Sequence, residues 1–271
     1  MRRSVSYLLN ERAIFKRENL RLAEQARILF DLEYPVLRRL IGRRPGTLLD
    51  AGCGNGAYLA RLARRFPHLA MVGIDRHPRL LAAARLHCPR ATFLRCEITD
   101  RAQLTEVVAK QPPQVVLLRF VIQHMSADER ALAFETLHRV LPARTKLIII
   151  EPDPDTFATT PPSPAIQYLA ARVSLITEAR GADRRVVHHL PHALRAFSNL
   201  QQIARDTGSR ALGWRNAARV HMPILATRIT RDSSDFEATQ LSAARRWIRQ
   251  ASKLRGSRLA SSLIFTICER T

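Results

Sequence analysis

Three glycines at alternate positions stand directly behind an apolar run in the segment TLLDAGCGNG, residues 47–56. Because Gly52, Gly54 and Gly56 carry no side chain, a ligand can lie against bare backbone where a strand meets a helix. Dinucleotide-binding loops have the spacing G-x-G-x-x-G and direct a helix N-terminus at a pyrophosphate. Here the spacing differs, and Asp50 would repel a phosphate but could pair with an ammonium group. The loop therefore predicts a cationic ligand without phosphates.

The elements around this loop alternate between apolar runs and amphipathic stretches from residue 45 to residue 152. The apolar runs are TLLDAG, AMVGID, ATFLRCE, QVVLLRF and TKLIIIEPD. Near-continuous apolar runs of this length predict parallel strands that are buried on both faces. We therefore expect an α/β fold: a doubly wound, Rossmann-like, mostly parallel sheet of about seven strands with a helical cap. Such sheets bind ligands at the carboxyl ends of their strands.

The ordered motifs of residues 45–152 resemble those of the class I S-adenosylmethionine-dependent methyltransferases. The resemblance implies that LLDAGCGNG holds the methionine part of the cofactor and that Asp75, which ends VGID, binds both ribose hydroxyls. One carboxylate can accept two vicinal O–H hydrogen bonds, which suits this role. In FLRCEITD, Glu97 is expected at the adenine amine and the backbone of Ile98 beside the ring. The implied cofactor is S-adenosylmethionine, with S-adenosylhomocysteine as product.

A fourth motif, VVLLRFVIQHM, is similar to the segment of this family that flanks the reacting methyl group. It contributes Arg119 and Phe120 to the expected cofactor site and brings His124 close to the methyl. His124 is either a general base or a packed structural histidine. The full set of expected cofactor-binding residues is Arg21, Gln25, Asp50, Gly52, Gly54, Gly56, Asp75, Arg76, Glu97, Ile98, Arg119 and Phe120.

The N-terminal segment YLLNERAIFKRENLRLAEQARIL is similar to a helical lid found in a natural-product subgroup of these small-molecule methyltransferases. The resemblance implies that Tyr7 closes the pocket as a catalytic residue and that Arg21 and Gln25 approach the cofactor. Residues 4–41 carry an apolar stripe, and Pro35 is expected to divide them into two helices. Such helices could also reach a neighbouring subunit, so a homo-oligomer is possible.

Three residues are candidates for contact with the acceptor. Glu151 and Asp153 end the fifth apolar run, and they either touch the substrate or solvate a loop. Tyr168 lies in the next helical segment and lines either an apolar pocket or the core. The run HHLPH, residues 188–192, has no acidic or cysteine partner at a firm spacing, so no metal site is predicted.

The alternation ends at residue 152, and a Pro-rich, irregular segment follows. Beyond it we expect helices at 165–180, 190–208 and 235–254 and strands at 215–229 and 261–270. The predicted parts of the chain are an N-terminal helical lid (1–42), an S-adenosylmethionine-binding core (43–152), a substrate-cap insertion (153–190) and the C-terminal part of the core sheet (191–271).

The formal net charge of +21 allows three interpretations: a solvated basic surface, an anionic small substrate or a nucleic acid. The basic residues are spread along the whole chain and are mostly arginine, which favours the first interpretation and makes a nucleic-acid partner unlikely on this pattern. No apolar run has the length of a membrane span, and charges interrupt the N-terminal segment, so a cytoplasmic protein without a membrane partner is expected. The four cysteines form no CxxC pair and are expected to be reduced.

These features predict an enzyme that transfers a methyl group from S-adenosylmethionine to a small organic acceptor through a carbon, nitrogen or oxygen nucleophile. A sulfonium is already a good leaving group, so the protein must mainly align the nucleophile and exclude water. One alternative is an anionic acceptor such as a prenyl diphosphate or RNA. Another is a partner protein that binds the cofactor without catalysis.

Overall fold

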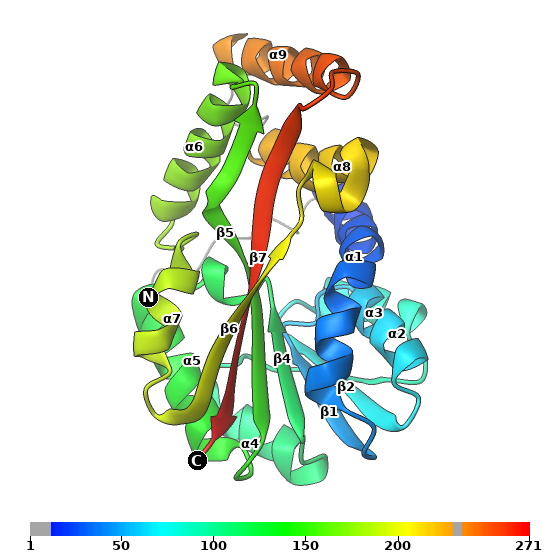
Figure 1. Cartoon of the computed structure of the whole chain (residues 1–271). Helices are drawn as coiled ribbons and strands as arrows, with labels where there is room; N and C mark the ends of the chain where they lie inside the picture. The colour runs from blue at the N-terminus through cyan, green and yellow to red at the C-terminus, as the bar shows by residue number, and fades with distance from the viewer. Residues whose placement is uncertain (1–11, 230–234) are drawn as a thin grey trace.

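The computed structural model describes residues 12–229 and 235–271 and contains one twisted sheet (Figure 1). Its strands are β1 (Gly46–Ala51), β2 (Leu69–Asp75), β3 (Thr92–Arg95), β4 (Val115–Arg119), β5 (Lys146–Thr160), β6 (Phe197–Asp206) and β7 (Arg258–Arg270). The order is β3-β2-β1-β4-β5-β7-β6, with β1 to β5 parallel and β6 and β7 antiparallel to their neighbours. The predicted seven-stranded, mostly parallel α/β fold is confirmed.

Helices cover both faces of this sheet, as a doubly wound fold requires. They are α1 (Arg12–Ile41), α2 (Ala57–Arg65), α3 (Pro78–His87), α4 (Arg101–Lys110), the 3₁₀ turn η1 (Ile122–His124), α5 (Ala127–Val140), α6 (Pro164–Glu178), α7 (Val186–Ala193), α8 (Ser209–Ile229) and α9 (Asp235–Ala251). One apolar core lies between the sheet and α1, α2 and α3, and a second lies between the sheet and α4, α5 and α7 (Figure 1).

The central strands are apolar along their whole length because both of their faces are buried. In β1, Leu48 belongs to the first core and Leu49 to the second, since neighbouring side chains of a strand point to opposite faces. Leu117 and Leu118 of β4 divide in the same way. This two-sided burial aligns the carboxyl ends of β1, β2 and β4 along one edge, where the polar residues of the motifs meet.

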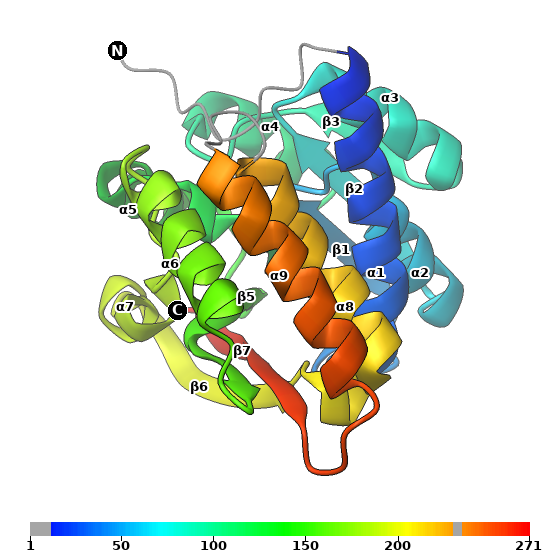
Figure 2. The ribbon, with the colours of Figure 1, turned by 90° about the horizontal axis from the view of Figure 1, so that it is seen from above.

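A third apolar cluster lies above that edge, between α6, α8 and α9. Seen from above, these three helices lie over the sheet, and α8 lies beside α1 (Figure 2). Leu169 and Val173 of α6, Leu225 of α8 and Leu241 of α9 form its centre. The strand β5 runs past the sheet edge to Thr160 and pairs there with β7, which carries the start of α6 above the other strands.

Pro35 does not divide the N-terminal segment, contrary to the prediction, because α1 continues through it to Ile41. A proline inside a helix removes one hydrogen bond and costs about 3 kcal/mol. The residues after it, Val36 and Leu37, are fully buried in the first core, and Tyr34 packs against Phe66, which follows α2. Burial of side chains of this size contributes about 1.5–3 kcal/mol each, which offsets the lost bond.

The C-terminal third departs from the predicted elements in three places. Residues 152–160, expected to be irregular, extend β5, and residues 197–206, expected to be helical, form β6 along β7. Residues 215–229, expected to be a strand, belong to α8. The predicted helices at 165–180 and 235–254 and the strand at 261–270 correspond to α6, α9 and β7. Residues 191–271 thus supply two sheet strands and also two of the three helices above the sheet.

No helix among the described residues is long and apolar enough to cross a membrane.

Candidate active site

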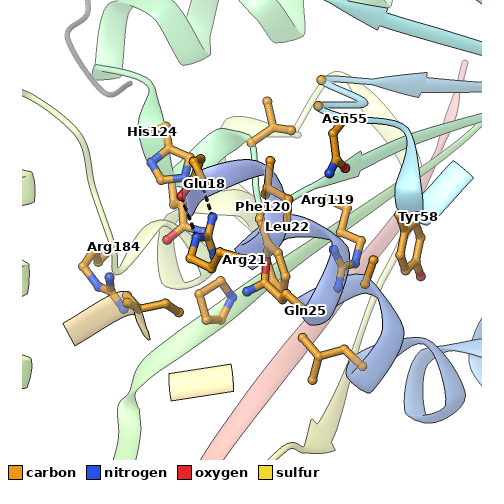
Figure 3. A pocket seen from close by; sticks show the side chains of 18 of the residues that line it. Glu18, Arg21, Leu22, Gln25, Asn55, Tyr58, Arg119, Phe120, His124 and Arg184 are labelled. Carbon is orange, nitrogen blue, oxygen red and sulfur yellow. Dashed lines mark hydrogen bonds and ion pairs between the residues drawn. The ribbon is translucent and has the colours of Figure 1, made fainter. Parts of the chain in front are cut away.

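A cavity of about 580 Å³ lies at the carboxyl ends of β1, β2, β3 and β4, enclosed by α1 on one side and by β5, α6 and α8 above. Figure 3 shows Tyr58 and Arg119 at one side of it, Arg184 at the other, and Arg21 and Gln25 of α1 between them. The cavity is therefore built from both the sheet and the helices above it.

The three glycines of the loop after β1 adopt positive φ angles of 87° at Gly52, 55° at Gly54 and 69° at Gly56. A Cβ atom at Gly52 would lie 2.5 Å from Cγ2 of Val121, so the loop can only approach β4 without a side chain there. Gly52 and Gly54 line the cavity. Gly56, expected to bind the cofactor, does not; a Cβ there would lie 2.8 Å from Cβ of Ala84, so Gly56 permits close packing of α3 instead.

Asp75 stands at the end of β2 with both carboxylate oxygens held by backbone groups. The N–H of Gly54 donates to Oδ2 at 2.9 Å and the N–H of His77 donates to Oδ1 at 2.8 Å. Each oxygen keeps a further acceptor site, so the carboxylate can still receive two hydroxyl groups from a ligand. Burial raises the pKa of Asp75, and the two backbone hydrogen bonds partly oppose that rise. This arrangement suits the predicted contact with a ribose.

The next strand supplies the edge expected to hold an adenine. Glu97 and Ile98 follow β3 and line the cavity, with Glu97 exposed and Ile98 buried. Arg76 lines the cavity beside Asp75, and its side chain is exposed. The three residues thus stand together, as the sequence predicts.

Asp50 lies at the cavity floor and is almost completely buried. Burial raises its pKa to about 7, Arg119 opposes this rise and the charge of Asp75 adds to it. A carboxyl group in that state is ready to ionise when a cationic group enters the cavity. The geometry therefore agrees with the predicted preference for an ammonium group.

Arg119, expected to bind the cofactor, directs its guanidinium at a residue that the sequence analysis missed. Its Nε donates to Oε2 of Glu33 at 2.8 Å, and its Nη2 donates to Oε1 at 2.9 Å. The guanidinium lies 4.1 Å from the ring centroid of Tyr58 and 4.2 Å from that of Phe120. Arg119 therefore joins α1 to the end of β4 within the cavity wall, and Phe120 lines the cavity beside it. Glu33 has no signal in the sequence that separates it from the surface acids of a helix.

Residues of α1 form the opposite wall. Glu18 accepts two hydrogen bonds from Arg21, at 2.8 Å and 2.6 Å, and Arg21 also donates to Oε1 of Gln25 at 3.4 Å. Asn55 of the glycine loop donates to the side chain of Asn19 at 2.9 Å, which ties the helix to the loop. Arg21 and Gln25 line the cavity, as expected. Tyr7, the predicted catalytic residue of this segment, lies outside the described residues.

His124 lines the cavity at the end of η1. Glu151, expected to touch the substrate, lies behind η1 instead and is fully buried. Its Oε1 accepts N–H hydrogen bonds from Ile122 at 2.7 Å and Gln123 at 3.3 Å. Burial raises the pKa of Glu151 to about 8, and the backbone bonds act against that rise. Glu151 thus fixes the turn that presents His124.

The other two predicted substrate residues have different positions. Asp153 lines the cavity at the start of the β5 extension. Tyr168 does not line it; its ring packs on the outer side of α6 against Phe236 of α9, with centroids 5.2 Å apart. The helical repeat places Tyr168 on the face opposite Val173, which does line the cavity.

The structure brings acidic partners to one of the histidines of HHLPH. Nε2 of His188 lies 3.3 Å from an oxygen of Asp153 and 3.3 Å from one of Asp155. The three side chains offer ligand atoms within 4.8 Å of one another. Arg185 also pairs with Asp155 at 2.9 Å, so a protein cation already occupies that acid. We interpret the cluster as a set of ion pairs at the cavity rim.

Two further residues of the cavity wall were not singled out by their sequence context. Arg184 lies between α6 and α7, and His221 lies in α8. Each is separated from the strand motifs by a long stretch of chain, and only the packing of α6 and α8 above the sheet brings it to the cavity.

Comparison with known proteins agrees with this geometry. A family model described as a methyltransferase domain matches residues 48–143. Trans-aconitate 2-methyltransferase of Acidovorax sp. (strain JS42) is 36% identical over 67 residues, which are 25% of this chain and 26% of that protein. Indolepyruvate C-methyltransferase of Streptomyces griseus is 28% identical over 161 residues, covering 57% of this chain and 49% of that protein. The chain thus spans between about a quarter and a half of the length of these curated relatives.

A similar fold occurs in phosphoethanolamine N-methyltransferase 2 of Haemonchus contortus, solved in complex with S-adenosyl-L-methionine. The TM-score is 0.58 at 15% sequence identity, over 97% of this chain and 59% of that chain. At this identity the likeness concerns the fold.

Proposed function

Because the chain belongs to the class I S-adenosylmethionine-dependent methyltransferases, we propose that it transfers a methyl group from S-adenosylmethionine to a small organic acceptor. The observation that carries the proposal is one continuous cavity with two chemically different ends. One end contains the glycine loop, Asp50 and Asp75, and the other contains Arg184 and His221 beneath the helices above the sheet. A transferase that joins two substrates needs both compartments.

The cofactor half offers a partner for each part of S-adenosylmethionine. Asp75 would accept the ribose hydroxyls, and Glu97 and Ile98 would contact the adenine. Asp50 would pair with the ammonium group beside the backbone of Gly52 and Gly54, both of which line the cavity. The fold neighbour from Haemonchus contortus was solved in complex with this cofactor, which supports S-adenosylmethionine as the ligand of such a fold.

S-adenosylmethionine supplies a methyl carbon on a positively charged sulfur, and the sulfur keeps the electron pair of the broken C–S bond. The acceptor forms the new bond with its own electron pair, so the protein must hold that atom in line with the C–S bond and about 3 Å from the carbon. His124 would take the proton of a hydroxyl or amine acceptor. A carbon or neutral amine nucleophile can attack without this base.

We further propose that α1 acts as one wall of a lid. Glu18, Arg21 and Gln25 line the cavity on this helix, and the buried pair of Glu33 and Arg119 anchors it to β4. Closure of the cavity by α1 would exclude water from the reacting methyl group.

The acceptor end of the cavity suits a small molecule rather than a polymer, because α6 and α8 contribute to its walls above the sheet. The names of two relatives refer to trans-aconitate and indolepyruvate, which are small organic acids. Both observations support a small-molecule acceptor.

The test is a radiolabel transfer assay with S-[methyl-³H]adenosylmethionine and a panel of small acids and amines that includes trans-aconitate, indolepyruvate and phosphoethanolamine. We expect time-dependent transfer of label to at least one acceptor, and loss of that transfer in Asp75→Ala. Cofactor binding without transfer to any small molecule of the panel or of a deproteinised cell extract would contradict catalysis and favour a binding protein.

A further inference from the structure

The half of the cavity away from the glycine loop forms a distinct compartment, here named the acceptor chamber. It is lined by Phe157, Val173, Arg184, His221, Ile224 and Leu225. These residues come from the β5 extension, α6, the segment after α6, and α8. The chamber combines the guanidinium of Arg184, together with that of the exposed Arg180, which also lines the cavity, with mostly apolar walls.

Arg184 stands in a segment whose position is fixed on both sides. The N–H of Asp183 donates to the carbonyl of Gln123 at 3.1 Å, and the Asp183 carboxylate pairs with Arg130 at 3.2 Å. On the other side, Val186 is buried in the second core. These anchors hold the backbone of Arg184 against η1, and its side chain reaches the cavity (Figure 3). The guanidinium is therefore presented to a ligand in a preorganised position.

His221 adds a side chain in which the donor and the acceptor nitrogen can be assigned. Its Nε2 lies 3.3 Å from the carbonyl oxygen of Thr207, which can only accept, so the ring donates from Nε2 and keeps its lone pair on Nδ1. Burial, together with the charge of Arg184, lowers the pKa of His221 to about 4. The imidazole is therefore neutral at physiological pH, and Arg184 supplies the positive charge.

The remaining walls of the acceptor chamber are apolar. Phe157 packs against the His221 ring with centroids 5.3 Å apart, and Val173 and Leu225 belong to the apolar cluster of α6, α8 and α9. An acceptor that fills this space gains free energy in proportion to the apolar area that it buries. Asp153, which also lines the cavity, adds one negative charge near the rim, so a ligand with one negative charge is favoured over one with two.

We propose that the acceptor is a small carboxylic acid with an apolar body, whose carboxylate lies at Arg184 and whose body lies against Phe157, Val173 and Leu225. The proposal rests on the proposed methyl transfer, because it assigns the second substrate of that reaction. A guanidinium matches the two oxygens of a carboxylate, and a charge-assisted hydrogen bond of this kind is stronger than a neutral one. The lone pair on Nδ1 of His221 can accept a hydrogen bond from an N–H or O–H group of the same acceptor.

The test is calorimetric titration of the full chain, saturated with S-adenosylhomocysteine, with hexanoate, 3-phenylpropanoate, 4-phenylbutanoate and the primary amide of each acid. We expect at least one acid to bind about 10- to 100-fold more tightly than its amide, since the amide has the same shape without the charge. Equal or weaker binding of all three acids, or no binding of any, would overturn the proposal. Tighter binding of 2-phenylethyl phosphate than of the best acid would overturn it as well.

Variants of two neighbouring arginines test whether Arg184 supplies the charge that binds the acid. Arg184→Gln should remove the preference for the acid and leave the affinity of the amide within twofold, whereas Arg184→Lys should keep part of the preference. Arg185→Gln is the matched control, because Arg185 is the next residue but pairs with Asp155 at the rim. A preference that survives Arg184→Gln, or that Arg185→Gln removes equally, contradicts the role of Arg184.

The titration of S-adenosylhomocysteine itself, done first, separates the two proposals. If the cofactor product does not bind, the proposed function fails and the acceptor assignment fails with it. If the product binds but no acid is preferred over its amide, only the acceptor assignment fails. Because the wild-type comparison of acid and amide needs no variant, the proposal can be tested even if Arg184→Gln does not fold.

Discussion

The cofactor half of the cavity and the acceptor chamber hold their side chains in different ways. In the cofactor half, backbone N–H groups fix Asp75, and the acids stand at the ends of parallel strands. In the acceptor chamber, Arg184 and His221 come from a connecting segment and a helix above the sheet. The first half is therefore part of the fold itself. The second half can change its side chains without changing the sheet, which suits a compartment that determines which acceptor binds.

The two halves of the cavity also differ in charge. Asp50 is a buried acid and Asp75 a partly buried one, both with raised pKa values, and a cationic cofactor would stabilise their ionised forms. The acceptor chamber has Arg184 and a histidine whose pKa lies far below neutrality. The cavity thus matches a positive ligand at one end and a negative ligand at the other.

Replacement of His124, which lines the same cavity, should have the largest effect. If it takes a proton from the acceptor, His124→Ala should lower turnover by about 10²–10⁴-fold with little change in cofactor affinity. His138→Ala serves as the control, because His138 bonds to Thr271 away from the cavity. Steady-state kinetics and calorimetry would measure both quantities. A loss of turnover below tenfold would make His124 a structural residue.

A side chain at Gly56 should lower the stability of the protein, because it would pack too closely against α3. Gly56→Ala combines a left-handed backbone, which costs about 1–2 kcal/mol, with a clash against α3, which costs about 1–3 kcal/mol. Gly42→Ala is the matched control, because its φ of 75° is similar and nothing lies within 4 Å of the added Cβ. Urea unfolding should show the larger loss of stability for Gly56→Ala, and equal losses would contradict the packing role.

Asp75→Ala should weaken ligand binding in the cofactor half and leave ligand binding in the acceptor chamber unchanged. Loss of charge-assisted bonds to the ribose is expected to cost about 1.5–3 kcal/mol of S-adenosylmethionine binding. Asp31→Ala, an exposed acid of α1, should leave the affinity unchanged. Acid probes that enter the acceptor chamber should bind as before when the protein is saturated with S-adenosylhomocysteine. Unchanged cofactor affinity in Asp75→Ala would contradict the assignment of this half.

A smaller effect should appear in the pH dependence of cofactor affinity. Burial raises the pKa of Asp50 to about 7, so pairing with an ammonium group requires loss of a proton, and the affinity should rise with pH between 5.5 and 7.5. The rise is at most about tenfold per pH unit, and Asp50→Asn should remove it.

Without cofactor, the raised pKa of Asp50 makes the free energy of unfolding decrease as the pH rises. Its stabilising contribution is present below about pH 4 and is lost as the pH rises through 7.

The sequence was sufficient to predict β1 to β4, the first part of β5, and the acids at the ends of β1, β2 and β3. Strands buried on two faces are apolar along their length, and a parallel sheet brings their carboxyl ends together, so order along the chain defines position in space. The late elements lack such a signal. The strand β6 is mostly exposed and exists through its pairing with β7, and α8 has apolar residues on several faces because it packs against α1, α6 and β7.

The missed residues of the site have the same cause. Glu33 looks like an ordinary acid of an amphipathic helix until α1 packs beside β4 and buries it against Arg119. Arg184 and His221 become neighbours only when α6 and α8 close over the sheet. Tyr168, in contrast, has the aromatic character of a pocket residue but lies on the outer face of α6. Residue type indicates possible chemistry, and long-range packing decides which side chains reach the cavity.

The most direct test of the account is calorimetric titration of the wild-type chain with S-adenosylhomocysteine and, separately, with NAD⁺. The account predicts one S-adenosylhomocysteine per chain, with a dissociation constant of about 1–100 μM, and no binding of NAD⁺, because Asp50 beneath the glycine loop disfavours a pyrophosphate. Binding of NAD⁺ at least as tight as that of S-adenosylhomocysteine, or no binding of S-adenosylhomocysteine at all, would contradict it.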